Sequence, residues 1–522
     1  MNNDSSSRWR NVILNSGVLT LLQFFTIILR FINQTVFIRI LGKEFLGLNG
    51  LFANLLTYLS FAELGIGISI VFSLYKPLHD NDKKKISALM NFLKRAYIVI
   101  GIIIILLGIF LLPILPYVIK DYGSISYVPF YFILYLSNSA ISYFYTYKRS
   151  ILIADQKEYK SSFNTFKYTL IQTVIQILVL YYFKAYSIYL IVATICTFIS
   201  NISISNLVNK EYPYLNSKNN FKLKLNRIEL HEIKNNIIGM VGSRIGSIVV
   251  RSTDNLLLST FMGLAVVGVY SNYLLIVTSV STVLLKLISS VTASVGNLVV
   301  ENNSKKSFFI YNSHFYVNLI MTGITSACLL VSLNPFIEAW VGKTYVLSKI
   351  TVLVIVINYF IDQLRQSSIV FVSAYGLFVP NGKKSIIEAI VNFLLSLFFL
   401  TEMKLGIQGV LLGTIVTNLI VNSWFEPFII FKNGFHLVQY FLKFYLKTYL
   451  FNLLLMIFII GLLSSLIGII DSYIQLPMIL IAIMNSMIIS VLLLLIILVI
   501  FKNQANVVYI REKIFKKIFS KK

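Results

Sequence analysis

Two long stretches with almost no charged residue constrain the fold of this chain most. Residues 98–119 and 478–501 each contain more than 20 consecutive uncharged, mostly apolar residues. A helix of that length crosses a hydrocarbon core of about 30 Å. Only 12% of the 522 residues are charged, whereas soluble domains carry about 25%. The sequence therefore predicts an integral membrane protein.

The apolar runs between charged or turn-forming breaks predict an all-α integral membrane fold with about 14 transmembrane helices. Because this number is even, both termini should lie on one side of the membrane. Several spans exceed 25 residues, which indicates tilted or extended helices. The predicted spans are residues 12–40, 46–74, 96–118, 126–147, 163–183, 187–208, 235–260, 265–298, 308–334, 346–376, 385–401, 406–431, 441–470 and 475–501.

The distribution of Lys and Arg supports this topology. Of the 45 basic residues, 33 lie on the side that holds both termini, six on the opposite side and six inside spans. The positive-inside rule then predicts a multi-pass protein of the cytoplasmic membrane with both termini in the cytoplasm. The net charge of +25 is explained by anionic membrane lipids, and no nucleic-acid partner is expected.

A repeat with a constant offset relates the two halves of the chain. Residues 15–91 align without a gap on residues 236–312. Both copies begin on the cytoplasmic side, which predicts two pseudo-symmetric six-helix bundles related by an axis along the membrane normal. The aligned residues include Arg30 with Arg251, Gly42 with Gly263, Gly47 with Gly268, Asn81 with Asn302, and Lys84 and Lys85 with Lys305 and Lys306.

These observations divide the chain into four predicted parts. Two six-helix bundles are joined by a cytoplasmic linker rich in Lys, Asn and Glu. Two additional C-terminal helices and a basic cytoplasmic tail follow the second bundle. The predicted limits are 1–208, 209–234, 235–431 and 432–522.

Polar side chains recur on one face of the first and seventh apolar segments. Spacings of seven and three residues place each trio on one helical face. An arginine at mid-membrane costs about 2.5–3.5 kcal/mol on insertion scales, so each face needs a water-filled cavity, a partner or an anionic ligand. The trios are Gln23, Arg30 and Asn33, and Arg244, Arg251 and Asp254.

Two further pairs of charges lie within predicted spans. Lys286 aligns with a position two residues beyond Glu63, so these two side chains could pair across the bundles. Asp362 and Arg365 have the i,i+3 spacing of a pair on one helix. Taken as a set, the five cations exceed the three acids, and this surplus favours an anionic ligand; the cations are Arg30, Arg244, Arg251, Lys286 and Arg365, and the acids are Glu63, Asp254 and Asp362. The alternative is an internally paired network that fixes helix packing.

Other charges have a peripheral interpretation. Glu388 and Glu426 lie close to the predicted cytoplasmic ends of their spans, where basic head-group or loop partners are within reach. The four histidines have no metal-ligand spacing, and no P-loop is present. We therefore expect no catalytic residue, no metal and no bound cofactor.

The chain resembles the polysaccharide transporters of the multidrug/oligosaccharidyl-lipid/polysaccharide exporter superfamily, particularly Wzx-like flippases of Gram-positive surface polysaccharides. The resemblance lies in LYKPLHDNDKKKISALMNF at Leu74–Phe92, EYPYL at Glu211–Leu215 and TDNLLLSTFMGLAVVGVYSNY at Thr253–Tyr273. These stretches are typical of the family and contain no catalytic signature.

The resemblance implies transport of an undecaprenyl-diphosphate-linked oligosaccharide to the outer leaflet by alternating access. It also implies a cationic central cavity and a groove for the lipid tail formed by the extra helices. A diphosphate accepts bidentate hydrogen bonds from Arg. The predicted diphosphate-binding residues are Arg30, Arg244, Arg251, Lys286 and Arg365; Glu63, Asp254 and Asp362 are predicted to pair with them or to bind a coupling H⁺ or Na⁺, and Gln23 and Asn33 are supporting polar residues.

Two other functions remain open. A multidrug exporter of the toxic-compound extrusion type would share the twelve-helix core, although cationic drugs favour an acidic or aromatic cavity. A membrane polysaccharide polymerase or glycosyltransferase would be expected to carry a sizeable outer loop with catalytic residues, and the longest predicted outer connection has only about a dozen residues. We therefore expect a transporter that works beside such enzymes and is not itself an enzyme.

Overall fold

The computed structural model describes residues 2–63, 65–120, 122–216, 225–227, 230, 233, 252–289, 295, 303–471, 476–502 and 504, without the side chains of residues 2–17, 61, 62 and 68. Ten helical stretches in this part are long and apolar enough to cross a membrane. The prediction of an all-α, multi-pass membrane protein is therefore confirmed. The chain forms two compact units, Met1–Gly268 and Val269–Lys522, each of which is described by itself.

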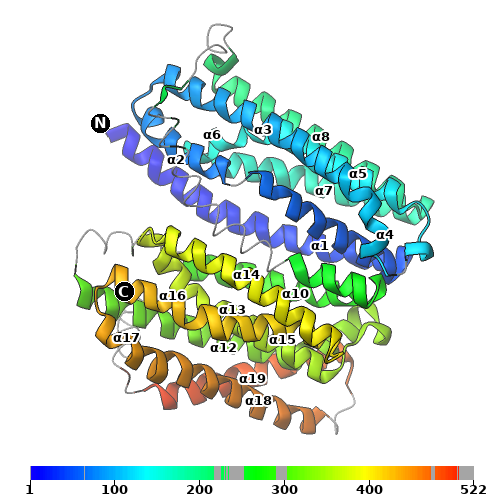
Figure 1. The fold of residues 1–522 in the computed structure, drawn as a ribbon, viewed down its shortest axis with the longest axis vertical. Helices are drawn as coiled ribbons and strands as arrows, with labels where there is room; N and C mark the ends of the chain where they lie inside the picture. The colour runs from blue at the N-terminus through cyan, green and yellow to red at the C-terminus, as the bar shows by residue number, and fades with distance from the viewer. Residues whose placement is uncertain are drawn as a thin grey trace. The chain divides into compact units, whose positions relative to one another are not determined.

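In the first unit, long helices lie side by side, with α1 against α7, α7 against α8, α8 against α5 and α5 against α3 (Figure 1). Rings of Phe52 and Phe132 meet edge to face in its buried interior, with their centroids 5.2 Å apart. The elements are α1 (Asn2–Leu59), η1 (Ser60–Glu63), α2 (Ile66–His79), α3 (Lys83–Leu111), η2 (Leu112–Ile114), α4 (Leu115–Val118), η3 (Tyr122–Ser124), α5 (Val128–Thr146), α6 (Arg149–Ala154), α7 (Glu158–Phe183), α8 (Tyr186–Glu211) and η4 (Pro213–Asn216).

The second unit is built around α12, which packs against α13, α18 and α19 (Figure 1). The helix α10 begins in the first unit and continues into the second. The elements are α10 (Leu264–Ser289), α12 (Ser304–Val341), η6 (Lys343–Tyr345), α13 (Lys349–Ala374), α14 (Phe378–Thr401), α15 (Ile407–Thr417), η7 (Asn418–Asn422), α16 (Ser423–Ile429), η8 (Ile430–Gly434), α17 (Val438–Phe444), η9 (Tyr445–Leu450), α18 (Phe451–Asp471) and α19 (Met478–Ile500).

The last two helices dock onto α12 because a glycine leaves room for them. A Cβ atom on Gly323 would lie 2.1 Å from Cε of Met456, a buried residue of α18. Cys328 of α12 lies 3.0 Å from the hydroxyl of Ser490 in α19. At the far end, the Asn485 amide donates to the Asp471 carboxylate at 2.7 Å. The two predicted C-terminal helices thus form one layer on α12.

Helices cover the predicted spans in the described residues, but several extend well past the predicted limits: α3 begins at Lys83 where the predicted start is 96, and α14 at Phe378 where it is 385. Residues 235–251 and most of 290–298 of the predicted spans lie outside the described residues. Two further differences have clear causes. The predicted span 46–74 is interrupted at Glu63–Gly65, where Gly65 adopts a left-handed conformation, with φ 79°. The spans 126–147 and 346–376 become α5 and α13, which are not among the ten apolar stretches. Both are more polar, α5 through its tyrosines, serines and an asparagine and α13 through its charges and glutamines.

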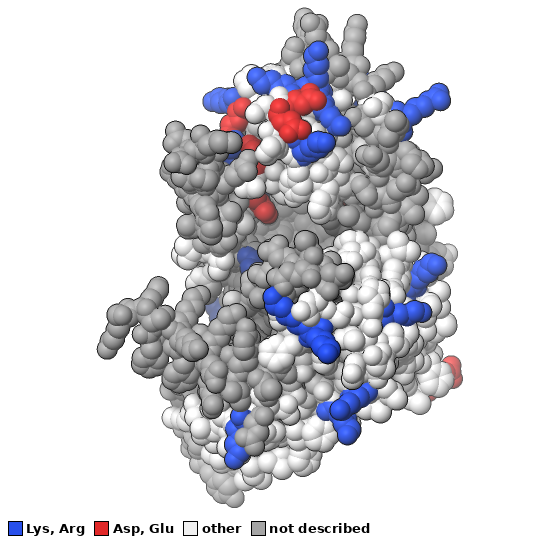
Figure 2. All heavy atoms as spheres, turned by 90° about the vertical axis from the view of Figure 1, so that its left-hand side faces the viewer, with Lys and Arg blue, Asp and Glu red and all other residues white. Residues whose placement is uncertain are grey.

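Figure 2 shows the face toward which α2 and α6 lie, and Lys and Arg are spread widely over it. The charge asymmetry counted from the sequence stays a prediction. Which side of the membrane this face occupies stays a prediction, as do the four domain limits.

The internal repeat is visible in the local geometry of both copies. Gly42 and Gly263 both have left-handed backbones, with φ values of 85° and 96°. Two N-caps correspond as well. The Asp82 side chain accepts from the Lys85 backbone N–H at 3.0 Å, and the Asn303 side chain accepts from that of Lys306 at 3.0 Å. The two copies therefore resemble each other in backbone conformation and helix capping as well as in sequence.

The two copies also cross each other at equivalent glycines. A Cβ atom on Gly47 would lie 1.9 Å from the carbonyl oxygen of Leu264, and one on Gly268 would lie 1.9 Å from that of Lys43. Leu264 and Gly268 are the positions aligned with Lys43 and Gly47 in the repeat. The helix crossing is therefore symmetric about a local two-fold axis, and only glycine permits its close approach.

Candidate functional site

The polar face predicted in the first span lies on α1. Arg30 is exposed and has no hydrogen-bond or ionic partner among the residues that the structure describes. Gln23 is half-buried on the same helix. Arg30 lies twelve residues before the break at Gly42, or about 18 Å from it at 1.5 Å per residue. A guanidinium without a partner in the described residues therefore stands inside this apolar helix.

Asn33 joins a polar cluster with α7 and α8. Its amide donates to the Gln176 side chain at 3.2 Å and to the Tyr189 hydroxyl at 3.0 Å. The Gln176 amide in turn donates to the Tyr189 carbonyl at 3.0 Å. Because the buried Asn33 Oδ1 has no partner in the described chain, the cluster retains one open acceptor. Asn33 thus ties α1 to α7 and α8, and its predicted role as a supporting residue of the ligand site stays a prediction.

The second polar face is only partly within the described residues. Arg244 and Arg251 lie outside them. Residues 252–261 are helical, and Asp254 is half-buried there, with its Oδ1 buried and without a hydrogen-bond partner in the described ranges. The adjacent Thr253 hydroxyl lies 2.8 Å from that of Tyr58 on α1. Asp254 therefore offers an open carboxylate oxygen inside an apolar segment.

The predicted pair of Glu63 and Lys286 belongs to two different units, so the pairing stays a prediction. Within the first unit, the carboxylate of Glu63 accepts from the Tyr97 hydroxyl at 2.7 Å. Lys286 is exposed near the end of α10 and has no partner in the described part of the chain. Both side chains remain within reach of solvent or a ligand.

A buried charge network in the second unit surrounds Arg365 of α13. Its guanidinium donates two hydrogen bonds to the Glu426 carboxylate, from Nη2 at 2.6 Å and from Nε at 3.2 Å. Nη1 lies 3.5 Å from Glu388 and 3.8 Å from Asp362. Arg365 and Glu426 are 7% and 1% exposed. The guanidinium is thus enclosed by carboxylates in the manner of a bidentate Arg–carboxylate pair.

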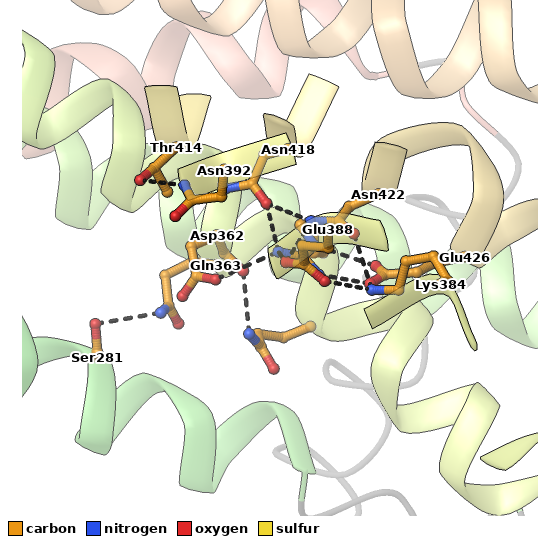
Figure 3. Close-up of polar contacts among 12 residues, drawn as sticks. Ser281, Asp362, Gln363, Lys384, Glu388, Asn392, Thr414, Asn418, Asn422 and Glu426 are labelled. Carbon is orange, nitrogen blue, oxygen red and sulfur yellow. Dashed lines mark hydrogen bonds and ion pairs between the residues drawn. The ribbon is translucent and has the colours of Figure 1, made fainter. Parts of the chain in front are cut away.

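Lys384 of α14 completes the network from the other side. Its ammonium group donates to Glu426 at 2.8 Å, to Glu388 at 2.9 Å and to Asn422 at 2.8 Å, which accounts for all three of its N–H groups. Figure 3 shows the side chains of Lys384, Glu388, Asn422 and Glu426 pointing toward one another. The network, defined as Arg365, Lys384, Glu388 and Glu426, has two positive and two negative charges and is therefore neutral.

Local helix geometry brings the network together. A π-helical turn, η7, carries Asn418 and Asn422 next to the charges, and such turns are frequent at functional sites. Asn418 accepts from Arg365 at 2.5 Å, and Asn422 donates to Glu388 at 2.6 Å. The helices α14 and α15 approach closely because a Cβ atom on Gly413 would lie 2.6 Å from the backbone nitrogen of a facing residue.

Three interpretations from the sequence change here. Glu388 and Glu426 are deeply buried, at 6% and 1% exposure, and not peripheral, because α14 begins at Phe378 and carries Glu388 well inside the bundle. Counting these acids and Lys384, six cations face five acids, so the predicted surplus falls from two to one. Arg365 matches the alternative of an internally paired network, while Asp362 is half-buried at its edge.

Spacing alone contained a signal for this network. Lys384 and Glu388 are an i,i+4 pair, and Asn418, Asn422 and Glu426 recur every four residues. Both patterns put polar side chains on one helical face. They indicate which sides of α14 and α16 turn inward.

Several solved structures share this fold. The lipid II flippase MurJ, in an inward closed conformation, matches with a TM-score of 0.62 and 18% identity, covering 93% of this chain and 98% of its own. An inward-facing multidrug resistance MATE family transporter of the MOP superfamily matches with 0.59 and 14%, over 82% and 99%. A Vibrio cholerae MATE transporter, VcmN, gives 0.53 and 14%, over 82% and 99%. No family model and no curated protein matches the chain.

Proposed function

We propose that this protein is a flippase that moves an undecaprenyl-diphosphate-linked oligosaccharide across the cytoplasmic membrane for capsular or exopolysaccharide synthesis. The fold it shares with transporters and with a lipid flippase supports the general class. Glycosyltransferases would supply the substrate, and a polymerase would consume it. The diphosphate is the chemical group for which the unpaired cations of this chain are suited.

Arg30 is the observation that carries the proposal. A guanidinium on an apolar helix, exposed and without a partner in the described chain, costs several kcal/mol unless water or an anion meets it. Arg365 does not serve this purpose, since carboxylates already occupy it. We therefore assign the diphosphate first to Arg30, with Lys286 and the undescribed Arg244 and Arg251 as the other candidate contacts.

The C-terminal helix pair favours a lipid substrate over a drug. The likeness to the lipid II flippase covers 93% of this chain, and the small uncovered remainder is shorter than α18 and α19 together, which have 21 and 23 residues. The match therefore includes at least part of this pair. Phe451, Phe458 and Leu466 are 50–67% exposed on α18. An apolar surface of this kind suits a polyprenyl tail.

Ion coupling is a further part of the proposal. Asp254 has an open, buried carboxylate oxygen in the described chain and Asp362 lies at the edge of the charge network. Either carboxylate could take up H⁺ or Na⁺ when the cations release the diphosphate. Removing each carboxylate separately, by Asp254→Asn and Asp362→Asn, and measuring transport against imposed H⁺ and Na⁺ gradients assigns the coupling residue.

The test uses the purified chain in vesicles that contain undecaprenyl diphosphate bearing a short fluorescent oligosaccharide. Loss of fluorescence to a membrane-impermeant quencher measures flipping. We expect Arg30→Gln to slow flipping at least about tenfold, and Arg30→Lys to retain part of the rate because it keeps the charge without the bidentate fork. Arg39→Gln is the matched control, since Arg39 is an exposed arginine on the same helix.

Two results would reject the proposal. Flipping by Arg30→Gln at the normal rate removes the role of Arg30. Export of cationic dyes by vesicles that do not flip the lipid would instead establish the multidrug function. Product analysis with sugar donor and acceptor tests the polymerase or glycosyltransferase alternative, for which we expect no new glycosidic bond.

A further inference from the structure

A second group of cations lies at the end of the first unit where α5 ends and α6 begins. Lys148 and Arg149 are consecutive residues, both half-buried, at the junction of these helices. The helix α6 packs against α2, α7 and α8. Neither side chain has an acidic partner within 4 Å in the described part of the chain, and neither belongs to the predicted transport face. We call these two residues the Lys148–Arg149 pair.

Arg149 is held only by neutral groups. Its Nη1 donates to the Thr165 hydroxyl at 2.5 Å and to the Ser161 hydroxyl at 3.3 Å, and Nη2 donates to Asn201 Oδ1 at 3.3 Å. Ser161 and Asn201 are buried, at 7% and 2% exposure. The side chain is thus fixed in one orientation while its positive charge stays uncompensated.

Lys148 is held in the same way. Its ammonium group donates to the Ser205 hydroxyl and to Asn209 Oδ1, both at 2.7 Å. Burial, and after it the charge of Lys94, lowers the pKa of Lys148, and burial lowers that of Arg149. Both shifts report cations without a countercharge, which an anion would relieve.

Neighbouring cations at the same end show a different arrangement. Lys157 lies 2.7 Å from Asp155 and 3.5 Å from Glu211, and Lys160 is bonded to Glu211. The Tyr212 hydroxyl also donates to Asp155 at 2.5 Å. These two acids are therefore occupied. The Lys148–Arg149 pair differs from Lys157 and Lys160 in having no acid within 4 Å among the described residues.

All the unmet hydrogen-bonding groups at the pair are donors. Arg149 uses three of its five N–H groups and Lys148 two of its three. The Asn201 Nδ2 is buried beside Arg149 and has no acceptor in the described residues. A ligand that fits here must carry several acceptor oxygens and negative charge, and a phosphate group satisfies both conditions.

Apolar surface next to the pair indicates that the phosphate belongs to a lipid. Ile191, Ile195 and Phe198 are 38%, 51% and 39% exposed on α8. Asn209 lies on the same helical face, about five turns beyond Ile191. The Phe198 ring meets that of Tyr145, with centroids 5.8 Å apart. An acyl or prenyl chain can follow this face toward its head group at Lys148.

We propose that the Lys148–Arg149 pair is a binding site for the phosphate of a lipid head group. Arg149 offers its remaining N–H groups to two phosphate oxygens, and Lys148 offers its third. The lipid is either the polyprenyl-linked substrate of the proposed function, docked before transport, or an anionic phospholipid of the membrane. The site does not require the proposed function, since a phospholipid would bind to a transporter of any cargo.

Native mass spectrometry of the full chain in detergent tests the site with undecaprenyl phosphate, phosphatidylglycerol and phosphate-free diacylglycerol. We expect adducts with one or both phosphate lipids but not with diacylglycerol. The double substitution Lys148→Gln and Arg149→Gln should weaken binding at least tenfold, which is about 1.4 kcal/mol at 25 °C. Lys160→Gln is the matched control, because it removes a similarly exposed cation that already has an acid, and it should leave binding unchanged.

A measurement on the unaltered protein removes any dependence on the folding of the variant. Phosphate lipid should slow phenylglyoxal modification of Arg149 severalfold, relative to diacylglycerol. Preference for undecaprenyl phosphate identifies the substrate lipid, and preference for phosphatidylglycerol identifies a membrane lipid. Equal binding by the double variant, or equal modification with and without phosphate lipid, overturns the site. Loss of flipping activity alone bears only on the proposed function.

Discussion

Replacing Glu426 with glutamine should destabilise the second unit strongly. In the native network, Glu426 accepts from Arg365 at 2.6 Å and from Lys384 at 2.8 Å while 1% exposed. The substitution keeps the side-chain volume but leaves two buried cations with Glu388 as their only buried carboxylate, a net charge of +1. Removing one partner of a buried ion pair costs about 3–5 kcal/mol. We expect a loss in that range.

Two further variants separate charge from shape. Lys384→Met should cost a similar amount, because it leaves the network with a net charge of −1. Combining it with Glu426→Gln restores neutrality, so the double variant should lose less than the sum of the two by about 0.5–3 kcal/mol. Asp362→Asn is the matched control. Asp362 is 40% exposed and 3.8 Å from Arg365, and exposed pairs contribute about 0–1 kcal/mol.

Unfolding in mixed detergent micelles, followed by circular dichroism, gives the free energies for all four variants. Each variant should show the native helix content by circular dichroism before unfolding, which establishes that the substitution has not altered the fold. A Glu426→Gln variant no less stable than Asp362→Asn would show that the four charges are not coupled in a dry interior. Additivity in the double variant would lead to the same conclusion.

Two other outcomes concern glycines of α1 and α18 and a lysine at the predicted cytoplasmic end. Gly47→Ala puts a methyl carbon 1.9 Å from a backbone oxygen and should lower the free energy of unfolding by about 1–3 kcal/mol or more. Gly461→Ala meets nothing within 4 Å and should raise the free energy of unfolding by about 0.5–1 kcal/mol. Opposite shifts of the thermal midpoint of unfolding check this. Burial lowers the pKa of Lys157, but Asp155 and Glu211 together outweigh burial and raise the pKa above 10.5. The stabilisation from these contacts is therefore present below pH 10.5 and lost as pH rises further. Lys157→Met should flatten the alkaline fall in stability, and an unchanged fall would contradict the assignment.

The sequence predicts the helices of this fold well because membrane spans are long, apolar and bounded by charges. The repeat aligned Gly42 with Gly263, and the structure adds that both have left-handed backbones. The interruption at Gly65 was missed. Its signal in the sequence is only local, the charge of Glu63 and the glycines at 65 and 67, within a run that is otherwise apolar.

The charge network was only partly predictable. A charge near the end of an apolar span can either extend to the head groups or face the bundle interior, and position in the sequence alone does not decide between the two. Glu388 and Glu426 were therefore assigned to the ends of their spans, while tertiary packing of α13 on α15 and α16 buries them. Arg30 was predicted to need water, a partner or an anionic ligand, and it has no hydrogen-bond or ionic partner among the described residues.

The glycine crossing has a consequence for the origin of the chain. Lys43 meets Gly268 and Gly47 meets Leu264, so each contact is repeated when the two copies are exchanged. This is the defining property of an isologous interface, the kind through which identical subunits form closed dimers. A protein half this length would carry both sides of the crossing on one surface and would pair with itself there. Duplication and fusion of its gene then converts a dimer contact into an intramolecular one, after which the two glycines must be kept together.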